Sequence, residues 1–148
     1  MSFLQVSRKV DYALRAVIHL ANEADGDRAC SVSGIAEREL IPRQFLEKIV
    51  RQLIQHGLVR SRRGARGGYV LARPPDQVTF RDVIEAVEGP ISLNVCVGEH
   101  PDCSLLGACG MNRVWAEGQR RVMDLFQSTT IASVRTPAAA ALRPEYPS

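Results

Sequence analysis

The chain has 148 residues, 45% of them hydrophobic and 24% charged, and it carries a formal net charge of +3. This length and balance suit one globular domain with a short extension, and they exclude a disordered chain. The sequence lacks an apolar run of the roughly 20 residues that span a bilayer, and its N-terminal stretch is amphipathic, so we expect no membrane segment, no secretory signal and a cytoplasmic protein.

Two N-terminal helices are predicted from apolar residues that recur at every third or fourth position. The first covers residues 10–21 and is followed by a polar loop. The second covers residues 34–40, with Ser31 or Ser33 as its N-cap and Leu40 on its buried side. Each helix is expected to contribute one apolar face to a common core.

A third helix is predicted over residues 42–56. Pro42 suits its first position because the first turn leaves that backbone N–H unpaired in any case, and Gly57 suits its end. Phe45 belongs to its regularly spaced apolar positions and is expected in the core. Two helices joined by a tight turn form a helix-turn-helix, in which the second helix of the pair enters the major groove of DNA.

A basic hairpin is predicted directly after these helices. Its strands cover residues 58–61 and 69–72, and its loop contains three glycines. Five arginines and no acidic residue lie between Arg60 and Arg73, a pattern typical of phosphate binding, although a solvated run of charge is the alternative. The order of elements predicts a mainly α fold with a small β-wing, a winged helix-turn-helix.

The C-terminal half is predicted to contain a short helix over residues 79–87 and a long helix over residues 111–128. The long helix is too apolar for the outside of one small domain, so we expect it to pack against a second copy of itself. The chain then divides into a winged helix-turn-helix domain, a cysteine-rich loop, a dimerisation helix and a flexible tail, over residues 1–89, 90–110, 111–134 and 135–148.

DNA-reading side chains are expected on the third helix and in the wing. Arginine can bind guanine, glutamine can bind adenine, and glutamate can accept a hydrogen bond from cytosine, while wing arginines can reach phosphates or a narrow minor groove. Glu47 also has a plainer interpretation, as a surface carboxylate paired with Arg51. The predicted DNA-binding residues are Arg43, Gln44, Glu47, Lys48, Arg51, Arg62, Arg63 and Arg66.

Three cysteines share the loop before the long helix. Cys96, Cys103 and Cys109 are separated by six and then five residues. Thiolates are the preferred ligands of iron–sulfur clusters, and a loop has the backbone freedom to bring them together. Three thiolates are an incomplete set, so zinc, a redox pair and unrelated thiols remain alternatives. Cys30 lies far from this group and is expected to be a free structural thiol.

The cysteine loop and the wing together resemble a known family. The run GLVRSRRGARGGYVLARP, followed by TFRDVIEAVEG and CVGEHPDCSLLGACGMNRVW, is similar to the Rrf-two family of winged-helix regulators, and the resemblance covers roughly residues 6–134. It implies a homodimer that carries an iron–sulfur cluster, [2Fe-2S] or [4Fe-4S], whose state alters promoter binding.

The resemblance also implies a fourth ligand of the cluster. Asn112 stands where the Isc-like members have a histidine, whereas Asp11 stands where the Nsr-like members have an aspartate donated by the partner subunit. His19 and His100 are weaker candidates. The implied ligands are Cys96, Cys103, Cys109 and Asp11.

These features predict a non-enzymatic, homodimeric repressor that binds a two-fold-symmetric site on double-stranded DNA and senses nitric oxide, iron or redox state. It resembles the Nsr and Rir regulators more than the Isc regulator. A cluster-free thiol-switch regulator is the first alternative. A metalloenzyme or electron carrier is the second, but the sequence shows no nucleophile–base set or phosphate loop, and the basic wing would then be unexplained.

Overall fold

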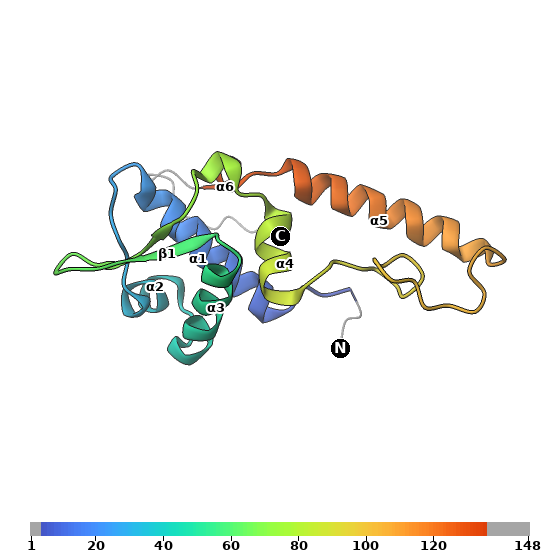
Figure 1. Cartoon of the computed structure of the whole chain (residues 1–148), viewed down its shortest axis with the longest axis horizontal. Coiled ribbons are helices and arrows are strands. Elements are labelled where there is room, and N and C mark those ends of the chain that lie inside the picture. The colour runs from blue at the N-terminus through green and yellow to red at the C-terminus, as the bar shows by residue number, and fades with distance from the viewer. Residues whose placement is uncertain (1–3, 136–148) are drawn as a thin grey trace, which may run out of the picture.

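The structure, a computed structural model, describes residues 4–135. Figure 1 shows a body of short helices with a two-stranded hairpin at one end and a long helix that extends from the other. The mainly helical class and the small antiparallel sheet confirm the predicted fold. In chain order the elements are α1 (Arg8–Ala24), α2 (Val32–Glu39), α3 (Arg43–Gln55), β1 (Val59–Arg62), β2 (Gly68–Leu71), the 3-10 helix η1 (Pro75–Gln77), α4 (Phe80–Glu88), α5 (Gly110–Ser128) and α6 (Ile131–Val134).

Helix α1 is the central element of the body and contacts α2, α3, α4, α6 and β2. It begins two residues before the predicted start, because the Ser7 hydroxyl caps it by accepting a hydrogen bond from the Val10 N–H at 3.3 Å. It also ends three residues later than predicted, since no helix-breaking residue occurs before Gly26. Its buried face is lined by Val10, Ala13, Ala16, Val17, Leu20 and Ala21.

The turn between α2 and α3 departs from the sequence prediction. Of the two serines predicted as the N-cap of α2, Ser31 is the one that caps it, accepting a hydrogen bond from the Gly34 N–H at 3.0 Å. The prediction that Leu40 is buried is wrong, because its side chain is 82% exposed. Leu40 adopts a left-handed conformation, with φ of 55°, which ends the helix and turns the chain so that Ile41 enters the core instead. Pro42 is the N-cap of α3 rather than its first residue.

The hairpin pairs β1 with β2 in antiparallel register, with Val59 opposite Leu71 and Arg62 opposite Gly68. The observed strands begin one residue away from the predicted ones. Beyond the hairpin, Cys30 and Tyr69 exchange two backbone hydrogen bonds of 2.9 and 2.8 Å, which attach β2 to the loop between α1 and α2. Glycine is required at position 68, because an added Cβ would lie 2.6 Å from the Cys30 carbonyl oxygen.

The chain after α5 returns to the body and pairs with the start of α4. The Phe80 N–H donates to the Thr129 carbonyl at 2.9 Å, and the Ile131 N–H donates to the Val78 carbonyl at 2.8 Å. This pairing keeps residues 129 and 130 extended, so the long helix ends at Ser128 and does not continue through residue 134 as one dimerisation helix. The return places Ile131 in the core with its side chain fully buried.

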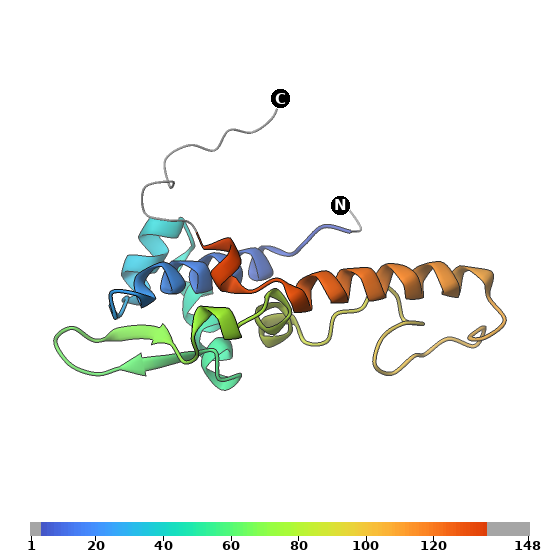
Figure 2. The ribbon, with the colours of Figure 1, turned by 90° about the horizontal axis from the view of Figure 1, so that it is seen from above.

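Helix α5 extends beyond the body like an arm, and the segment between α4 and α5 runs beside it (Figures 1 and 2). Within the described part of the chain, no α5 residue falls in the fully buried class. Among residues 4–135, no helix has both the length and the apolar composition to cross a membrane. Apart from Arg135, the predicted tail lies outside the described residues.

Replacement of Ile131 by alanine is expected to lower the free energy of unfolding by about 2–5 kcal/mol, since it removes a buried aliphatic side chain and leaves a cavity. The measurement is a urea unfolding curve. The control is Leu40→Ala, which truncates a side chain that is 82% exposed and is expected to change stability by only about 0.5 kcal/mol. Equal losses in the two variants would contradict the assignment of Ile131 to the core.

Candidate functional site

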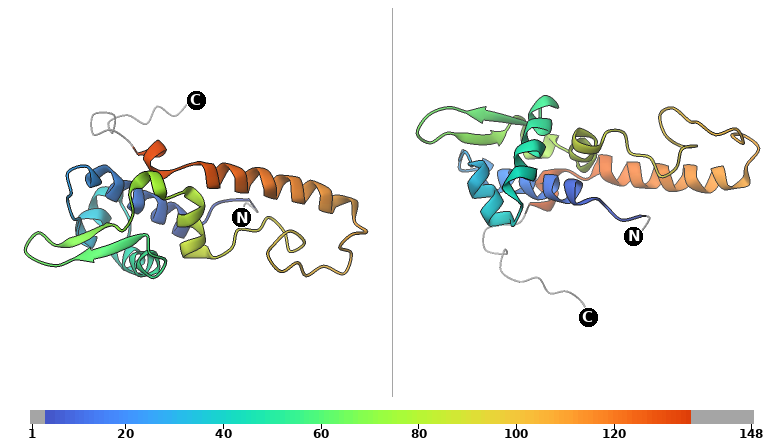
Figure 3. Two further views of the ribbon diagram at one scale, coloured as in Figure 1. Left: turned by 45° about the horizontal axis from the view of Figure 1, so that its top comes forward. Right: turned by 90° about the horizontal axis from the view of Figure 1, so that it is seen from below.

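Helix α3 presents a polar face to solvent, and that face holds the residues predicted to read DNA. Leu46, Ile49, Val50 and Leu53 fix its orientation by burying the opposite face. In Figure 2 and both views of Figure 3, α3 and the hairpin lie on the same side of the body, as recognition of one DNA site by both requires. The exposed predicted residues of α3 are Arg43, Gln44, Lys48 and Arg51, and Glu47 is half-exposed.

Glu47 pairs with Arg43, not with Arg51 as the plainer interpretation of the sequence suggested. The Arg43 Nε lies 3.2 Å from the Glu47 Oε1, one helical turn away. Arg51 and both residues of this pair line a hollow of about 440 Å³ that also contacts Tyr69 of the hairpin and Ser33 of α2. The hollow therefore joins the helix-turn-helix and the wing into one surface.

The prediction that Phe45 lies in the core is wrong. Its side chain is 55% exposed on α3. It packs edge-on against Tyr12 of α1, with ring centroids 6.3 Å apart, and the Arg15 guanidinium lies 5.8 Å from the centre of the Tyr12 ring. Helical spacing alone could not separate a core position from this one, because Phe45 lies at the edge of the buried face, where α1 covers only part of the ring.

The wing arginines differ in their surroundings. Arg63 and Arg66 are exposed in the hairpin loop, in a position to meet a polyanion. Arg62 is engaged by the chain itself, because its guanidinium donates to the carbonyl and the carboxylate of Asp27 at 2.9 and 2.6 Å. The hydrogen bond from Arg62 lowers the pKa of the Asp27 carboxyl below its ordinary value. Sequence reasoning missed Asp27, whose loop has no periodic pattern that would indicate it.

The three loop cysteines lie in the irregular segment between α4 and α5. Cys96, Cys103 and Cys109 are half-buried free thiols, and Cys109 is the N-cap of α5. Gln119 anchors the segment to α5, accepting from the Leu93 N–H at 2.9 Å and donating to the Ile91 carbonyl at 2.7 Å. Sequence reasoning did not identify Gln119, because a lone glutamine on a helix carries no distinctive signal.

Asn112 also contacts the cysteine loop. Its Nδ2 donates to the Cys96 carbonyl at 3.5 Å, and its own N–H donates to the Cys109 carbonyl at 3.2 Å. The side chain that stands in place of the histidine of the Isc-like pattern therefore attaches the backbone at Cys96 to the first turn of α5. The softness of three thiols suits iron, and the absence of helix or strand around them leaves room for rearrangement.

Asp11 lies on α1 rather than at the cysteine loop. Its carboxylate is half-exposed and pairs with Arg15 at 2.7 Å. Among residues 4–135, no three His, Cys, Asp or Glu side chains gather closely enough to hold a metal ion. The three thiols of a single chain are therefore not close enough together in this structure to bind a metal ion. His19, the weaker candidate on the same helix, bonds to Glu39 at 2.9 Å, and His100 is exposed in the loop.

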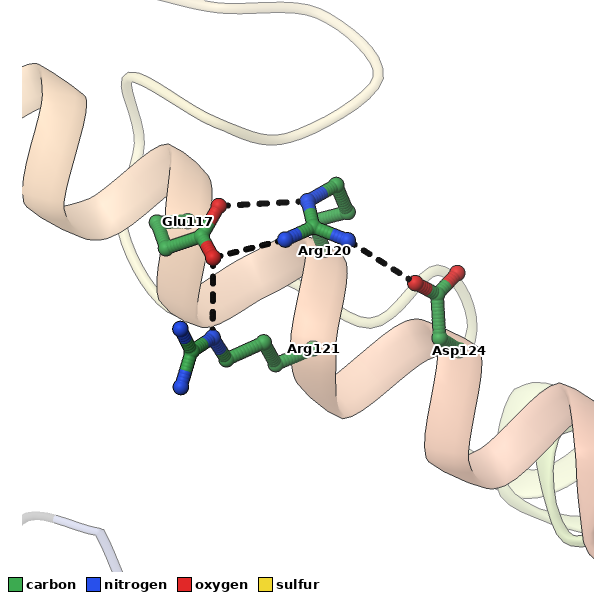
Figure 4. A network of polar contacts seen from close by, with 4 residues as sticks. All are labelled: Glu117, Arg120, Arg121 and Asp124. Carbon is green, nitrogen blue, oxygen red and sulfur yellow. Dashed lines mark hydrogen bonds and ion pairs between the residues drawn. The ribbon is translucent and has the colours of Figure 1, made fainter.

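The outer face of α5 combines exposed apolar side chains with charges that neutralise one another. Met111, Val114 and Leu125 are each at least 60% exposed. Beside them, Glu117 pairs with Arg120 at 2.6 Å and with Arg121 at 2.8 Å, and the two arginines lower the pKa of the Glu117 carboxyl (Figure 4). Because these charges are paired within the helix, they oppose the docking of another apolar surface less than free charges would.

Comparisons with known proteins agree with this architecture. A family model named Rrf2 and described as an iron-dependent transcriptional regulator matches residues 6–136. An HTH-type transcriptional regulator of Aquifex aeolicus is 36% identical over 127 residues, which cover 84% of this chain and 87% of that relative.

Two solved structures are also similar. One is CymR, the global cysteine regulator of Bacillus subtilis, with a TM-score of 0.74 and 33% identity over 89% of this chain and 96% of that one. The other is IscR of T. potens, with a TM-score of 0.71 and 32% identity over 88% of this chain and 85% of that one.

Proposed function

Because this chain belongs to the Rrf2 family of DNA-binding transcriptional regulators, which are not enzymes, we propose that it acts as a homodimeric repressor controlled by an iron–sulfur cluster. Cys96, Cys103 and Cys109 would supply three ligands, and Asp11 of the second subunit would supply the fourth. When bound, the cluster would supply the chemistry that responds to nitric oxide, iron or redox state.

The observation that supports this proposal most strongly is the position of the three thiols. All three are free and share a single irregular segment at the N-terminal end of the arm helix α5. A segment of this kind can rearrange around an inorganic ligand without breaking a helix or a strand. Gln119 and Asn112 attach the segment to α5, so a change in the loop would be transmitted to that helix.

The DNA-facing residues would divide into two groups. Gln44, Lys48 and Arg51, with the Arg43–Glu47 pair, would set sequence preference from the major groove, because they occupy the exposed face of α3. Arg63 and Arg66 would contribute salt-dependent affinity through the backbone or the minor groove. Two copies of α3 related by dimer symmetry would then read a two-fold-symmetric operator.

The second candidate is a regulator that switches through its thiols without a cluster. The similarity to CymR, named a global cysteine regulator, favours it. The same cysteines would then act by oxidation and reduction. The two candidates differ in composition, because only the first requires iron and sulfide in the purified protein.

Anaerobic purification separates the two candidates. The cluster-bound protein is expected to be brown, with visible absorption and with iron and acid-labile sulfide in comparable amounts. A colourless protein without iron, whose DNA binding is lost on mild oxidation and restored by a thiol reductant, would replace the cluster proposal by the thiol switch.

Replacement of Asp11 by alanine is expected to leave dimerisation and fold intact while the cluster acquires an altered absorption spectrum and decays faster in air. The fold should survive because the Asp11–Arg15 pair is solvent-exposed and contributes at most about 1 kcal/mol. The measurement is the decay of visible absorbance after exposure to air, with His100→Ala as the rival variant. A parental decay rate in Asp11→Ala together with cluster loss in His100→Ala would assign the fourth ligand to His100.

A further inference from the structure

We propose that Arg62 is a positioning residue that clamps the wing to the α1–α2 loop through Asp27, and that Arg28, Arg63 and Arg66 are the arginines left to meet the DNA backbone. The inference requires only that the wing takes part in DNA binding, and it is independent of any cluster. Arg62, which the sequence predicted to contact DNA, would then act within the chain. Arg28, which the sequence did not indicate, would contact DNA in addition to Arg63 and Arg66.

The clamp is formed by one guanidinium with two acceptors on one residue. Arg62 Nη1 donates to the Asp27 carbonyl at 2.9 Å, and Nη2 donates to Asp27 Oδ1 at 2.6 Å. Only 29% of the Arg62 side chain is exposed, whereas its neighbours Arg63 and Arg66 are exposed. A forked contact of this kind fixes direction as well as distance, and lysine could not reproduce it.

A second attachment lies nearby on the other strand of the hairpin. Tyr69 of β2 is bonded through its backbone to Cys30, and Gly68 allows the close approach that this bond needs. The wing is therefore attached to the same loop once through β1 and once through β2. One attachment would allow the hairpin to pivot, whereas two attachments fix its orientation relative to α3.

The Asp27 backbone closes the C-terminal turn of α1. Asp27 has φ of 50°, the left-handed conformation that ends many helices, and its N–H donates to the Ala24 carbonyl at 3.1 Å while the Arg28 N–H donates to the Glu23 carbonyl at 3.2 Å. This turn fixes the acceptors that Arg62 contacts. Arg62 lowers the pKa of the Asp27 carboxyl, so the ion pair persists to more acidic pH than an isolated carboxylate would allow. The charge of Arg62 is compensated within the chain by Asp27.

The remaining arginines surround a hollow beside this clamp. Arg28, Arg63 and Arg66 line a space of about 510 Å³ together with Asp27, Arg62 and Gly67. Arg28 is 76% exposed, and its nearest carboxylate, that of Glu23, is 3.7 Å away. Three exposed guanidiniums around one hollow fit the phosphates of a nucleic-acid backbone, with the clamp determining where the hollow faces.

The test measures operator affinity at several salt concentrations for Arg62→Ala, Asp27→Ala and the double variant. An exposed ion pair adds little to global stability, so the variants should fold normally. Each single variant is expected to bind about fivefold more weakly with an unchanged salt slope, and the double variant should match either single variant. Arg28→Ala and Arg63→Ala should instead lower the slope of log affinity against log salt by about 0.9 each.

The control is Asp25→Ala, which removes a nearby carboxylate that pairs with Arg135 and not with Arg62. If Arg62 contacted phosphate directly, Asp27→Ala would free its guanidinium, and this variant would bind DNA at least as tightly as Asp25→Ala. Arg62→Ala would then lower the slope of log affinity against log salt, as Arg63→Ala does. That pattern would overturn the proposal. Amide hydrogen exchange without DNA gives a second readout, because the Tyr69 N–H should exchange faster in Arg62→Ala than in Arg63→Ala.

Discussion

If the chain is the homodimer proposed above, replacement of both Val114 and Leu125 by glutamate is expected to produce monomers that bind operator DNA at least about 100-fold more weakly. The two side chains are 64% and 60% exposed on the same face of α5, so a partner helix would have to cover them. Two buried carboxylates without partners would prevent that packing. The lost affinity reflects the loss of simultaneous binding to two half-sites.

The measurements are light scattering for mass and a titration of fluorescent operator DNA for affinity. Asn22→Glu together with Gln127→Glu is the matched control, since both residues are exposed polar positions and the added charge is the same. A dimeric Val114→Glu/Leu125→Glu protein with parental affinity would exclude this face of α5 as the interface.

The second large effect is the loss of iron expected when a cysteine of the loop is replaced by alanine. Cys103→Ala should lose nearly all iron and visible absorption when it is purified without oxygen, because removal of one of three thiolates leaves too few ligands for the cluster. Cys96→Ala and Cys109→Ala should behave in the same way. All three variants should keep the parental helix content, since the irregular loop contributes no residue to the core.

Cys30→Ala is the matched control for these variants. Cys30 lies at the base of the wing, where partial burial raises the pKa of its thiol, so it is a poor thiolate donor. Its replacement should leave the iron content unchanged. Full iron in Cys103→Ala, or iron loss in Cys30→Ala, would assign the ligands differently.

Much of the fold could be predicted from local patterns. Helical periodicity located α1 to α5, Ser31 correctly indicated a helix start, and the glycine-rich stretch with its flanking alternation located the hairpin. These features depend on neighbours within a few residues, so they can be predicted from the sequence. The run of arginines was predictable for the same reason.

The candidate site could be predicted only in part. The cysteine spacing and the polar face of α3 marked the segments that matter, but side-chain pairing depends on which distant segment folds back. The attachment of Arg62 to Asp27 spans 35 residues, and the anchoring of Leu93 by Gln119 spans 26. No local pattern encodes such contacts, so Arg62 was indistinguishable from Arg63 in the sequence.

By itself the sequence determined the class of this protein, through residues whose effect is local: caps, breakers, apolar spacing and a basic loop. Only the tertiary structure decided which apolar residues are buried, as Leu40 and Phe45 illustrate. It also decided that the chain after α5 returns to the body, because Thr129 lies where the chain pairs with the start of α4 and Ile131 enters the core. Burial and long-range pairing are properties of the packed chain, since the free energy of one side chain there depends on which others cover it.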